Sequence, residues 1–227
     1  MIEPISIVEC CDNMEFMVKF PDKFFDLGCV DPGYGIGENW TKSKNSIHYK
    51  HHSSYKNKSI PTKEYFNELF RVSKNQIIWG GNYFTEFLRP TNSWIIWDKL
   101  KEVEKTFQSE CELAWTSFKV PTRFFRFQWD GAKKSTETGS TRIHPHQKPI
   151  TLYQFCFEKY LTPGAKILDT NLASQSSRIA AYKLGFYFWG CEIDEDYFKE
   201  GCKRFDKECQ GITEQQGIKV KQQKLFL

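Results

Sequence analysis

Short apolar runs alternate along the chain with amphipathic segments of helical period. Six runs of strand length end at polar, glycine or proline residues: Ile5–Cys10, Phe25–Val30, Gln76–Trp79, Ser93–Trp97, Lys166–Leu168 and Tyr187–Ile193. Apolar side chains recur at helical spacing over residues 64–72, Ser176–Leu184 and Glu195–Cys209. Strands that alternate with helices of this length are typical of βαβ units. The pattern therefore predicts an α/β fold with a mostly parallel sheet and helices on both faces.

Composition narrows the class of protein. Aromatic residues make up 16% of the 227 residues, which argues against wholesale disorder, and a net charge of +4 is too small to identify a polyanionic partner. No apolar run approaches the roughly 18 residues that a membrane-spanning helix needs, and the first residues lack the basic and apolar regions of a signal peptide. The eight cysteines form no C-x-x-C pair, so we expect reduced thiols in a cytoplasmic protein without membrane contact.

Two cation-rich stretches interrupt the alternation. Residues 41–60 hold five lysines and three histidines but no acid, and residues 119–142 mix cations with Phe124, Phe125, Phe127 and Trp129. Cations meet phosphates and rings stack on bases, so both stretches suit a DNA-facing surface; ordinary solvated loops are the alternative. The histidines have no cysteine or carboxylate beside them, which favours a solvated loop over a zinc site, and we expect no metal. The candidate DNA contacts are Lys42, Lys44, Lys50, Arg123, Arg126, Lys133, Lys134 and Arg142.

A strand that ends in an acid is the first candidate site. An apolar run leads directly into Asp31, Pro32, Gly33 and Tyr34. Ligands of parallel α/β sheets bind at the carboxyl ends of strands. There a carboxylate can accept hydrogen bonds from an amino group, and a tyrosine ring can stack on a planar group. The alternative is a Pro-Gly type II turn, which would need a glycine at position 33.

A second acid-terminated strand precedes a loop of small residues. Asp169 ends this strand, and residues 170–175 lead to a helix that begins near Ser176. This layout is typical of a nucleotide or nucleoside cofactor loop, in which the backbone approaches the ligand at a helix N-terminus. Glu192 ends the following strand, where an acid commonly holds a ribose hydroxyl pair. The alternative is an acid that only favours the start of the next helix.

Residues 142–149 alone indicate only a turn before a helix, with Pro149 placed to start it. Together, these segments resemble the circularly permuted, beta-class DNA amino-methyltransferases, over about residues 5–210. The small adenine-type enzymes of phages and prophages are the most similar. Residues 31–34 match the catalytic D-P-P-Y pattern, 144–149 match H-P-T-Q-K-P, and 169–176 match D-x-x-x-G-S-G-S. The order of these patterns is specific to this permutation.

The resemblance implies a Rossmann-like, S-adenosylmethionine-dependent methyltransferase domain over residues 1–210, a C-terminal tail over 211–227 and double-stranded DNA as substrate. It implies that a flipped base stacks on Tyr34, while Asp31 and the Pro32 carbonyl accept its two amino hydrogens. An acid in the first position is more like the adenine-N6 enzymes than the cytosine-N4 enzymes. Such an enzyme would act alone, as a homodimer or with a partner subunit. The implied cofactor contacts are Asp12, Gln147, Lys148, Asp169, Thr170, Ala173 and Glu192.

Three residues depart from the family patterns. Gly33 replaces the second proline of the catalytic pattern, and Ala173 and Gln175 replace both glycines of the cofactor loop. A left-handed backbone costs a non-glycine residue roughly 1–2 kcal/mol, and we expect the Gln175 side chain to take up space that the cofactor needs. Three interpretations remain. The chain is an adenine methyltransferase with a tolerant loop, a methyltransferase-fold protein that has lost transfer and serves as a DNA- or protein-binding module, or an unrelated α/β enzyme.

Overall fold

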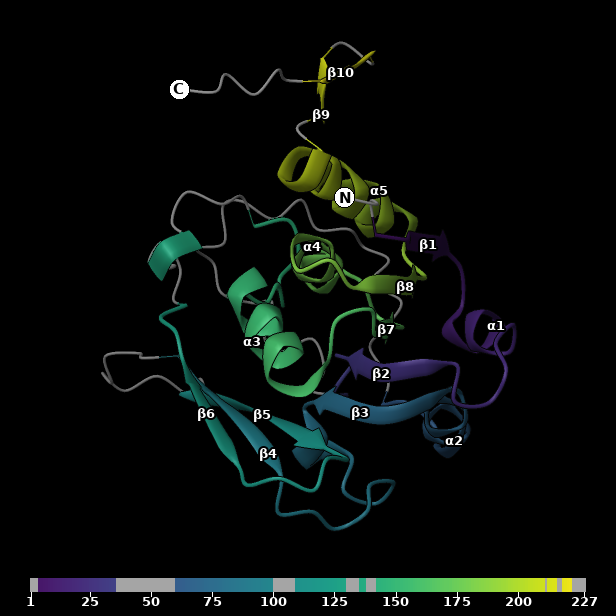
Figure 1. Cartoon of the computed structure of the whole chain (residues 1–227), viewed down its shortest axis with the longest axis vertical. Coiled ribbons are helices and arrows are strands. Elements are labelled where there is room, and N and C mark those ends of the chain that lie inside the picture. Colours follow the sequence, from purple (N-terminus) through teal and green to yellow (C-terminus); the bar gives the residue numbers. More distant parts are fainter. Residues whose placement is uncertain are drawn as a thin grey trace.

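The structure is a computed structural model that describes residues 4–35, 60–99, 109–129, 135–137, 142–210, 212–215 and 218–221. Five candidate DNA contacts lie outside the described residues: Lys42, Lys44, Lys50, Lys133 and Lys134. The histidines between positions 48 and 52 lie outside them as well. Figure 1 shows a twisted sheet between two layers of helices.

Eight strands form the main sheet, in the order β1-β8-β7-β2-β3-β5-β4-β6. The first five are mutually parallel: β1 (Ser6–Cys10), β8 (Tyr187–Glu192), β7 (Lys166–Asp169), β2 (Phe25–Val30) and β3 (Ser73–Trp79). β5 (Cys111–Thr116) runs antiparallel to β3 and to β4 (Trp94–Asp98), and β6 (Arg123–Arg126) pairs in parallel with β4. The prediction of a mostly parallel α/β sheet is confirmed.

Helices cover both faces of the sheet (Figure 1). α1 (Asn13–Met17) and α2 (Lys63–Val72) pack on one face, in a cluster that includes Val30. α3 (Ile150–Tyr160), α4 (Ser176–Lys183) and α5 (Glu195–Phe205) pack on the other face, in a cluster that includes Leu27 and Cys29. Because successive side chains of a strand point to opposite faces, β2 contributes to both halves of the core.

Local signals set the helix ends. The carboxylates of Asp12 and Asp194 accept backbone N–H groups as the N-caps of α1 and α5. Pro149 lies at the N-cap position of α3, where the sequence predicts a helix start. α5 ends before its predicted limit at Cys209, since the chain continues from Phe205 as a π-helical turn, η4 (Asp206–Gln210).

Part of the stretch 119–142, interpreted above as a DNA-facing loop, belongs to the sheet and the core. Residues 123–126 form the edge strand β6, and Phe127 and Trp129 are buried. Phe125 packs on Phe127, with ring centroids 5.7 Å apart, whereas Phe124 is exposed. The loop interpretation is wrong at these residues because the cations and aromatic rings of a half-buried edge strand have the same composition as a basic, aromatic loop.

The sheet has a switch point between β7 and β2. From β7 the chain crosses to β8 on one side, and from β2 it crosses to β3 on the other side. Open α/β sheets bind ligands outside the carboxyl ends of the strands at such a point. Asp169 and Asp31 lie at these two strand ends.

Two features of the described residues complete the fold. None of their helices is long and apolar enough to cross a membrane. β9 (Ile212–Gln215) and β10 (Ile218–Lys221) pair as an antiparallel hairpin in the segment interpreted as a tail.

Candidate active site

Four carboxylates lie at the carboxyl ends of four neighbouring parallel strands. Asp12 follows β1, Glu192 ends β8, Asp169 ends β7 and Asp31 follows β2. These strands are adjacent in that order. Because the strands are parallel, the four acids lie along one edge of the sheet, although they are far apart in the sequence.

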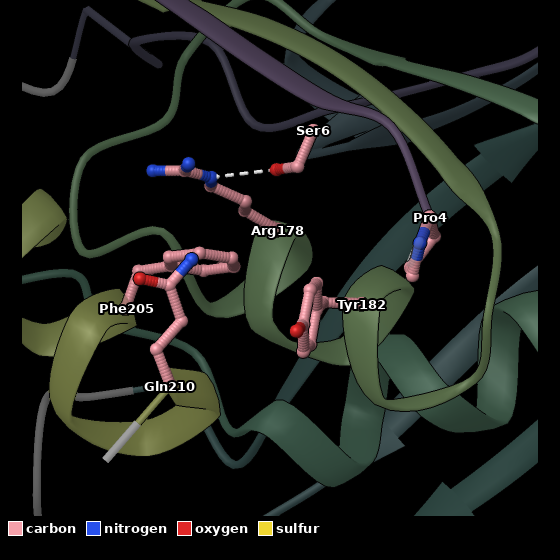
Figure 2. Close-up of a pocket in the computed structure, with 6 residues that line it drawn as sticks. All are labelled: Pro4, Ser6, Arg178, Tyr182, Phe205 and Gln210. Atoms are coloured by element: carbon pink, nitrogen blue, oxygen red, sulfur yellow. Dashed lines mark hydrogen bonds between the residues drawn. The ribbon is translucent and has the colours of Figure 1, made fainter. Parts of the chain in front are cut away.

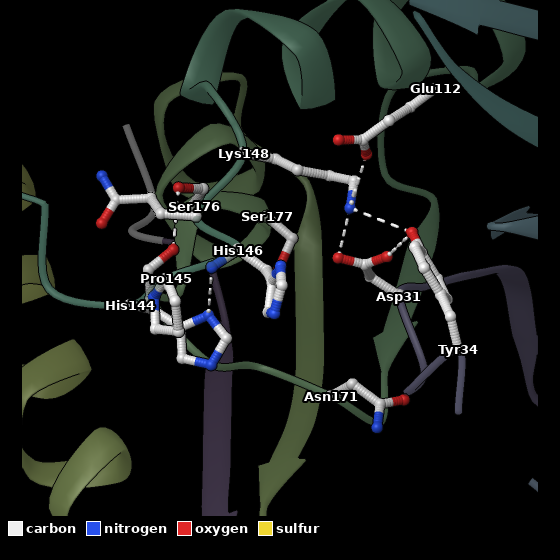
Figure 3. Close-up of polar contacts among 12 residues, drawn as sticks. Asp31, Tyr34, Glu112, His144, Pro145, His146, Lys148, Asn171, Ser176 and Ser177 are labelled. Atoms are coloured by element: carbon white, nitrogen blue, oxygen red, sulfur yellow. Dashed lines mark hydrogen bonds and ion pairs between the residues drawn. The ribbon is translucent and has the colours of Figure 1, made fainter. Parts of the chain in front are cut away.

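Asp31 is held by two side chains (Figure 3). Its Oδ1 accepts a hydrogen bond from the Tyr34 hydroxyl at 2.5 Å, and its Oδ2 forms a close ion pair with the Lys148 ammonium. Lys148 Nζ also lies 3.1 Å from Glu112 Oε2, and Lys99 Nζ lies 2.6 Å from Glu112 Oε1. Two acids and two lysines therefore alternate in one chain of contacts.

Burial makes the charge states of Lys148 and Glu112 depend on the charged groups beside them. Lys148 is 4% exposed. Burial alone would lower the pKa of its ammonium, but Asp31 and Glu112 outweigh burial and raise that pKa. Burial would raise the pKa of Glu112, but Lys148 and Lys99 hold it at about 2. Lys148 and Glu112 are therefore both charged at neutral pH. Lys148, which the resemblance implies as a cofactor contact, is the ion-pair partner of Asp31, the candidate catalytic acid.

Tyr34, the expected platform for a base, stacks on Tyr83, with ring centroids 5.0 Å apart and planes at 15°. Tyr83 belongs to η2 (Gly81–Tyr83), the turn after β3, and is 45% exposed. This turn approaches Tyr34 closely at Gly80, which has a φ of +70°; a Cβ there would lie 2.1 Å from a Tyr34 ring carbon. Glycine is required at position 80 for both reasons.

The alternative interpretation of residues 31–34 as a type II turn is wrong. Such a turn needs a positive φ at Gly33. Gly33 is not among the glycines with positive φ in the described residues, which are Gly35, Gly80, Gly164 and Gly185. Asp31 is therefore presented by a strand end without a turn of that type.

Asp169 is the most buried of the four acids. It is 1% exposed, and its carboxylate accepts hydrogen bonds from the Asn171 N–H at 2.9 Å and from the Ser177 hydroxyl. Burial raises its pKa to about 7, against the opposing effect of these hydrogen bonds. Next to it, the Thr170 hydroxyl shares a 2.7 Å hydrogen bond with the Tyr65 hydroxyl of α2. These contacts fix the start of the β7–α4 loop (residues 170–175).

Ala173 and Gln175 both have positive φ, +43° and +59°. The left-handed backbone considered for these two positions is therefore present. The Gln175 side chain is fully buried, and its Nε2 donates to the Phe198 carbonyl of α5 at 3.3 Å. The side chain points into the interface between α4 and α5, which argues against the expectation that it takes up cofactor space.

Glu192 links the β7–α4 loop to the neighbouring strand. Its Oε2 accepts from the Ala173 N–H at 2.8 Å and its Oε1 from the Asp194 N–H at 3.0 Å. Burial raises the pKa of Glu192, against the effect of these bonds. Asp194, and not Glu192, caps the following helix, so the helix-start alternative does not apply to Glu192.

The two remaining implied cofactor contacts differ in their surroundings. Asp12 accepts from the Met14 N–H at 2.8 Å as the cap of α1. Gln147 is 2% exposed, and its Oε1 accepts from the Ile143 N–H at 3.0 Å. The Nε2 of Gln147 has no hydrogen-bond partner among the described residues. A buried donor of this kind normally has a partner, so it is suited to a ligand.

The three described candidate DNA contacts are not equivalent. Arg126 is exposed and lies 3.5 Å from Asp98 Oδ2. Arg123 is half-buried in β6, and Arg142 donates to the backbone carbonyls of residues 144 and 145. Of these three, Arg126 has the exposure that a phosphate contact requires.

Sequence reasoning missed Glu112, Lys99 and Tyr83. Glu112 lies on β5, a strand that the hydrophobic pattern does not reveal, so nothing in the sequence linked it to Lys148. Tyr83 had one signal: it lies two residues after a Gly-Gly pair that directly follows a strand, and such a pair indicates a turn.

A cavity of about 250 Å³ lies elsewhere in the molecule (Figure 2). Arg178 lines it: its Nε donates to Ser6 Oγ at 2.8 Å, and its guanidinium lies 3.7 Å from the Phe205 ring centroid. None of the residues implied in catalysis or cofactor binding lines this cavity. Its lining residues are Pro4, Ser6, Arg178, Tyr182, Phe205 and Gln210.

Comparison by sequence gives a short match. No protein-family profile matches the chain. A segment of 63 residues is 36% identical to the candidate methylase YubD of Escherichia coli (strain K12). This match covers 28% of the chain and spans only 28% of the length of YubD.

Comparison by structure covers nearly the whole chain. TTHA0409, a candidate DNA modification methylase of Thermus thermophilus complexed with S-adenosyl-L-methionine, is 16% identical, with a TM-score of 0.58 over 91% of this chain and 97% of its own. The M1.HpyAVI–SAM complex is 15% identical, with a TM-score of 0.55 over 88% and 99%. PvuII DNA methyltransferase (cytosine-N4-specific) is 10% identical, with a TM-score of 0.59 over 88% and 87%. These likenesses confirm the predicted methyltransferase-type fold.

Proposed function

We propose that this protein is a DNA methyltransferase that transfers a methyl group from S-adenosylmethionine to the exocyclic amino group of a flipped base, with adenine N6 as the acceptor. One observation carries the proposal. The segment Asp31-Pro32-Gly33-Tyr34 and the β7–α4 loop follow adjacent strands at the switch point of a methyltransferase-type sheet. The fold alone would be insufficient, because one fold serves many functions.

Asp31 and the Pro32 carbonyl would orient the acceptor nitrogen. An exocyclic amino group has two hydrogens, and two acceptors in fixed positions direct its lone pair away from the base plane. Tyr34 donates to Oδ1 of Asp31 and Lys148 pairs with Oδ2, which leaves about two of the four acceptor positions of the carboxylate for the base. Orientation of this kind supplies much of the acceleration in a direct displacement.

The residues around the β7–α4 loop fit the cofactor. Glu192 uses two acceptor positions on backbone N–H groups. A carboxylate has about four such positions, so it can still accept from ribose hydroxyls. Gln147 Nε2 is a buried donor without a partner among the described residues. When bound, S-adenosylmethionine supplies an electrophilic methyl group on a sulfonium. The Asp169 carboxyl keeps the loop closed onto Ser177 and Asn171.

The choice of adenine rests on Asp31, since an acid in the first position of the catalytic pattern resembles the adenine enzymes. Double-stranded DNA is the proposed partner, and Arg126 is the exposed one of the three described candidate DNA contacts. A target base must leave the helical stack before its amino group can reach Asp31.

A second candidate function is DNA or protein binding without methyl transfer. The close ion pair between Lys148 and Asp31 favours it. A carboxylate that is paired with a buried ammonium is a weaker acceptor for an incoming amino group.

A methylation assay tests the proposal. Purified protein, unmethylated DNA and S-adenosylmethionine are incubated, and the DNA is digested and analysed by nucleoside mass spectrometry. We expect N6-methyldeoxyadenosine, which Asp31→Ala abolishes while calorimetry still detects cofactor binding. N4-methyldeoxycytidine would overturn the adenine assignment. Cofactor binding without methylation would support the second candidate, and absence of cofactor binding would overturn the enzymatic proposal.

A further inference from the structure

Both polar atoms of the Gln175 side chain have partners in the interface between α4 and α5. Nε2 donates to the Phe198 carbonyl and lies 3.3 Å from Cys202 Sγ, and Oε1 accepts from Arg178 Nη1 at 2.8 Å. The side chain is fully buried. A residue at the last position of a ligand-binding loop is therefore fastened to a helix behind that loop.

Helix α5 has a glycine, Gly201, at the position against which this side chain packs. A Cβ at Gly201 would lie 2.7 Å from Gln175 Cγ and 2.8 Å from its Nε2, which is closer than real Cβ contacts. Glycine is unfavourable inside a helix, and at position 201 it makes room for the glutamine. The loop thus lacks a glycine at position 175, while the helix opposite carries one.

The partner of Gln175 is itself held in place. Arg178 Nε donates to Oγ of Ser6, the first residue of β1, and its guanidinium stacks on Phe205 of α5 (Figure 2). The hydrogen bond from Arg178 to Gln175 therefore connects the loop to fixed parts of two other elements.

A second arginine holds the residues on either side of Gln175. Arg204 of α5 donates to the Ser174 carbonyl at 2.7 Å and to Ser176 Oγ at 2.8 Å. On the strand side, the Ala173 N–H donates to Glu192 at 2.8 Å. The end of the β7–α4 loop is therefore fixed by β8 in front and by α5 behind.

We propose that Gln175 is a positioning residue that clamps the β7–α4 loop to α5 and so presets the backbone of Ala173 and Ser174 for S-adenosylmethionine. The inference rests on the proposed function for the identity of the ligand. A glycine at position 175 would adopt the same φ but could not hold the loop. Because the clamp orders the loop before binding, less conformational freedom is lost when the ligand binds.

Variants of Gln175 separate the clamp from backbone strain. Glycine and asparagine both tolerate a left-handed backbone, and neither reaches Phe198 and Arg178 as glutamine does. Gln175→Glu keeps the acceptor for Arg178 but loses the donor. Two measurements are compared with the natural protein well below its unfolding temperature: calorimetric binding of S-adenosylmethionine, and hydrogen exchange of peptides from residues 170–180.

We expect Gln175→Gly and Gln175→Asn to bind S-adenosylmethionine at least fivefold more weakly, and by similar factors, with Gln175→Glu between them and the natural protein. Their loop peptides should exchange at least tenfold faster without ligand. Equal or tighter binding by either variant, together with unchanged exchange, would overturn the clamp and assign Gln175 to backbone strain alone. Should the natural protein not bind S-adenosylmethionine, the proposed function fails, and the exchange comparison alone decides on the clamp.

Gly201→Ala provides a matched control from the other side of the contact. In the natural protein the new methyl group collides with Gln175, so loop exchange should rise. In the Gln175→Gly background the space is free, and the same change should leave exchange unchanged and raise the melting temperature, because alanine favours a helix. Equal effects of Gly201→Ala in both backgrounds would show that the two residues are not coupled, and would overturn the clamp.

Discussion

Replacement of Asp169 by asparagine should stabilise the protein at pH 8.5 and leave its stability unchanged in acid. Burial raises the pKa of Asp169 from 3.8 to about 7. Because the pKa of this carboxyl is higher in the folded than in the unfolded state, the protonated group favours folding. This contribution to stability is complete below the unfolded pKa and is lost as the pH rises through the folded pKa. Asparagine stays neutral. Its oxygen can accept from the Asn171 N–H, and its amide can donate to the Ser177 hydroxyl.

The difference between the two pKa values sets the size of the effect. About three pKa units at 1.36 kcal/mol each correspond to about 4 kcal/mol, an upper bound because the site can relax around the charge. For a chain of this length, 1 kcal/mol shifts the melting temperature by about 2–4 °C. Asp169→Asn should therefore raise the melting temperature at pH 8.5 by up to about 8–16 °C.

Urea unfolding followed by tryptophan fluorescence, at pH 4 and at pH 8.5, measures the effect. Asp26→Asn is the matched control. Burial opposes ionisation of Asp26, but hydrogen bonds from Lys74 and from the Lys166 backbone hold its pKa below the usual value, so asparagine there should destabilise at pH 8.5. An equal effect of Asp169→Asn at both pH values, or destabilisation at pH 8.5, would refute a raised pKa for Asp169.

Three other predictions concern the active site, a glycine and the partner. Lys148→Met leaves two partly buried carboxylates without their shared, buried cation and should cost up to about 3–5 kcal/mol in chemical denaturation; a loss below about 1 kcal/mol would contradict a buried ion pair. Gly80→Ala should lower the melting temperature more than Gly164→Ala, since both have positive φ but only the first Cβ meets a ring, that of Tyr34; equal losses would argue against this contact. DNA affinity should fall steeply with salt and fall further in Arg126→Glu; salt-independent binding would remove a phosphate-contacting surface.

The sequence predicts best those parts of the fold that are buried on both faces. β2, β7 and β8 are apolar runs that end in or beside acids, so both the strands and the acids could be identified. β5 and β6 escaped prediction because these strands mix polar and aromatic residues and are partly exposed. A strand that is apolar on only one face lacks the continuous apolar run that marks a parallel strand buried on both faces.

The site residues at the ends of parallel strands could be predicted from the sequence, whereas those on the antiparallel part of the sheet could not. Parallel topology brings acids at strand ends together whatever the loops do, so their convergence could be inferred from order alone. The ion pair between Lys148 and Glu112 joins the segment before α3 to an antiparallel strand that was not predicted. No local rule connects two such positions. The direction of the Gln175 side chain also depends on a tertiary partner, Gly201, at a position that nothing local singles out.

These contacts change the interpretation of the departures from the family patterns. A left-handed Gln175 costs roughly 1–2 kcal/mol, and each hydrogen bond of its side chain contributes about 0.5–1.5 kcal/mol. Its bonds to Phe198 and Arg178 therefore offset the backbone strain, and the loss of a glycine from the loop is no argument for lost cofactor binding. The ion pair of Lys148 with Asp31 has no comparable offset, because a carboxylate that is paired with a buried ammonium is a weaker acceptor for the amino group of a target base. We therefore expect methyl transfer to depend more on the contacts of Asp31 than on the replacement of glycine at position 175.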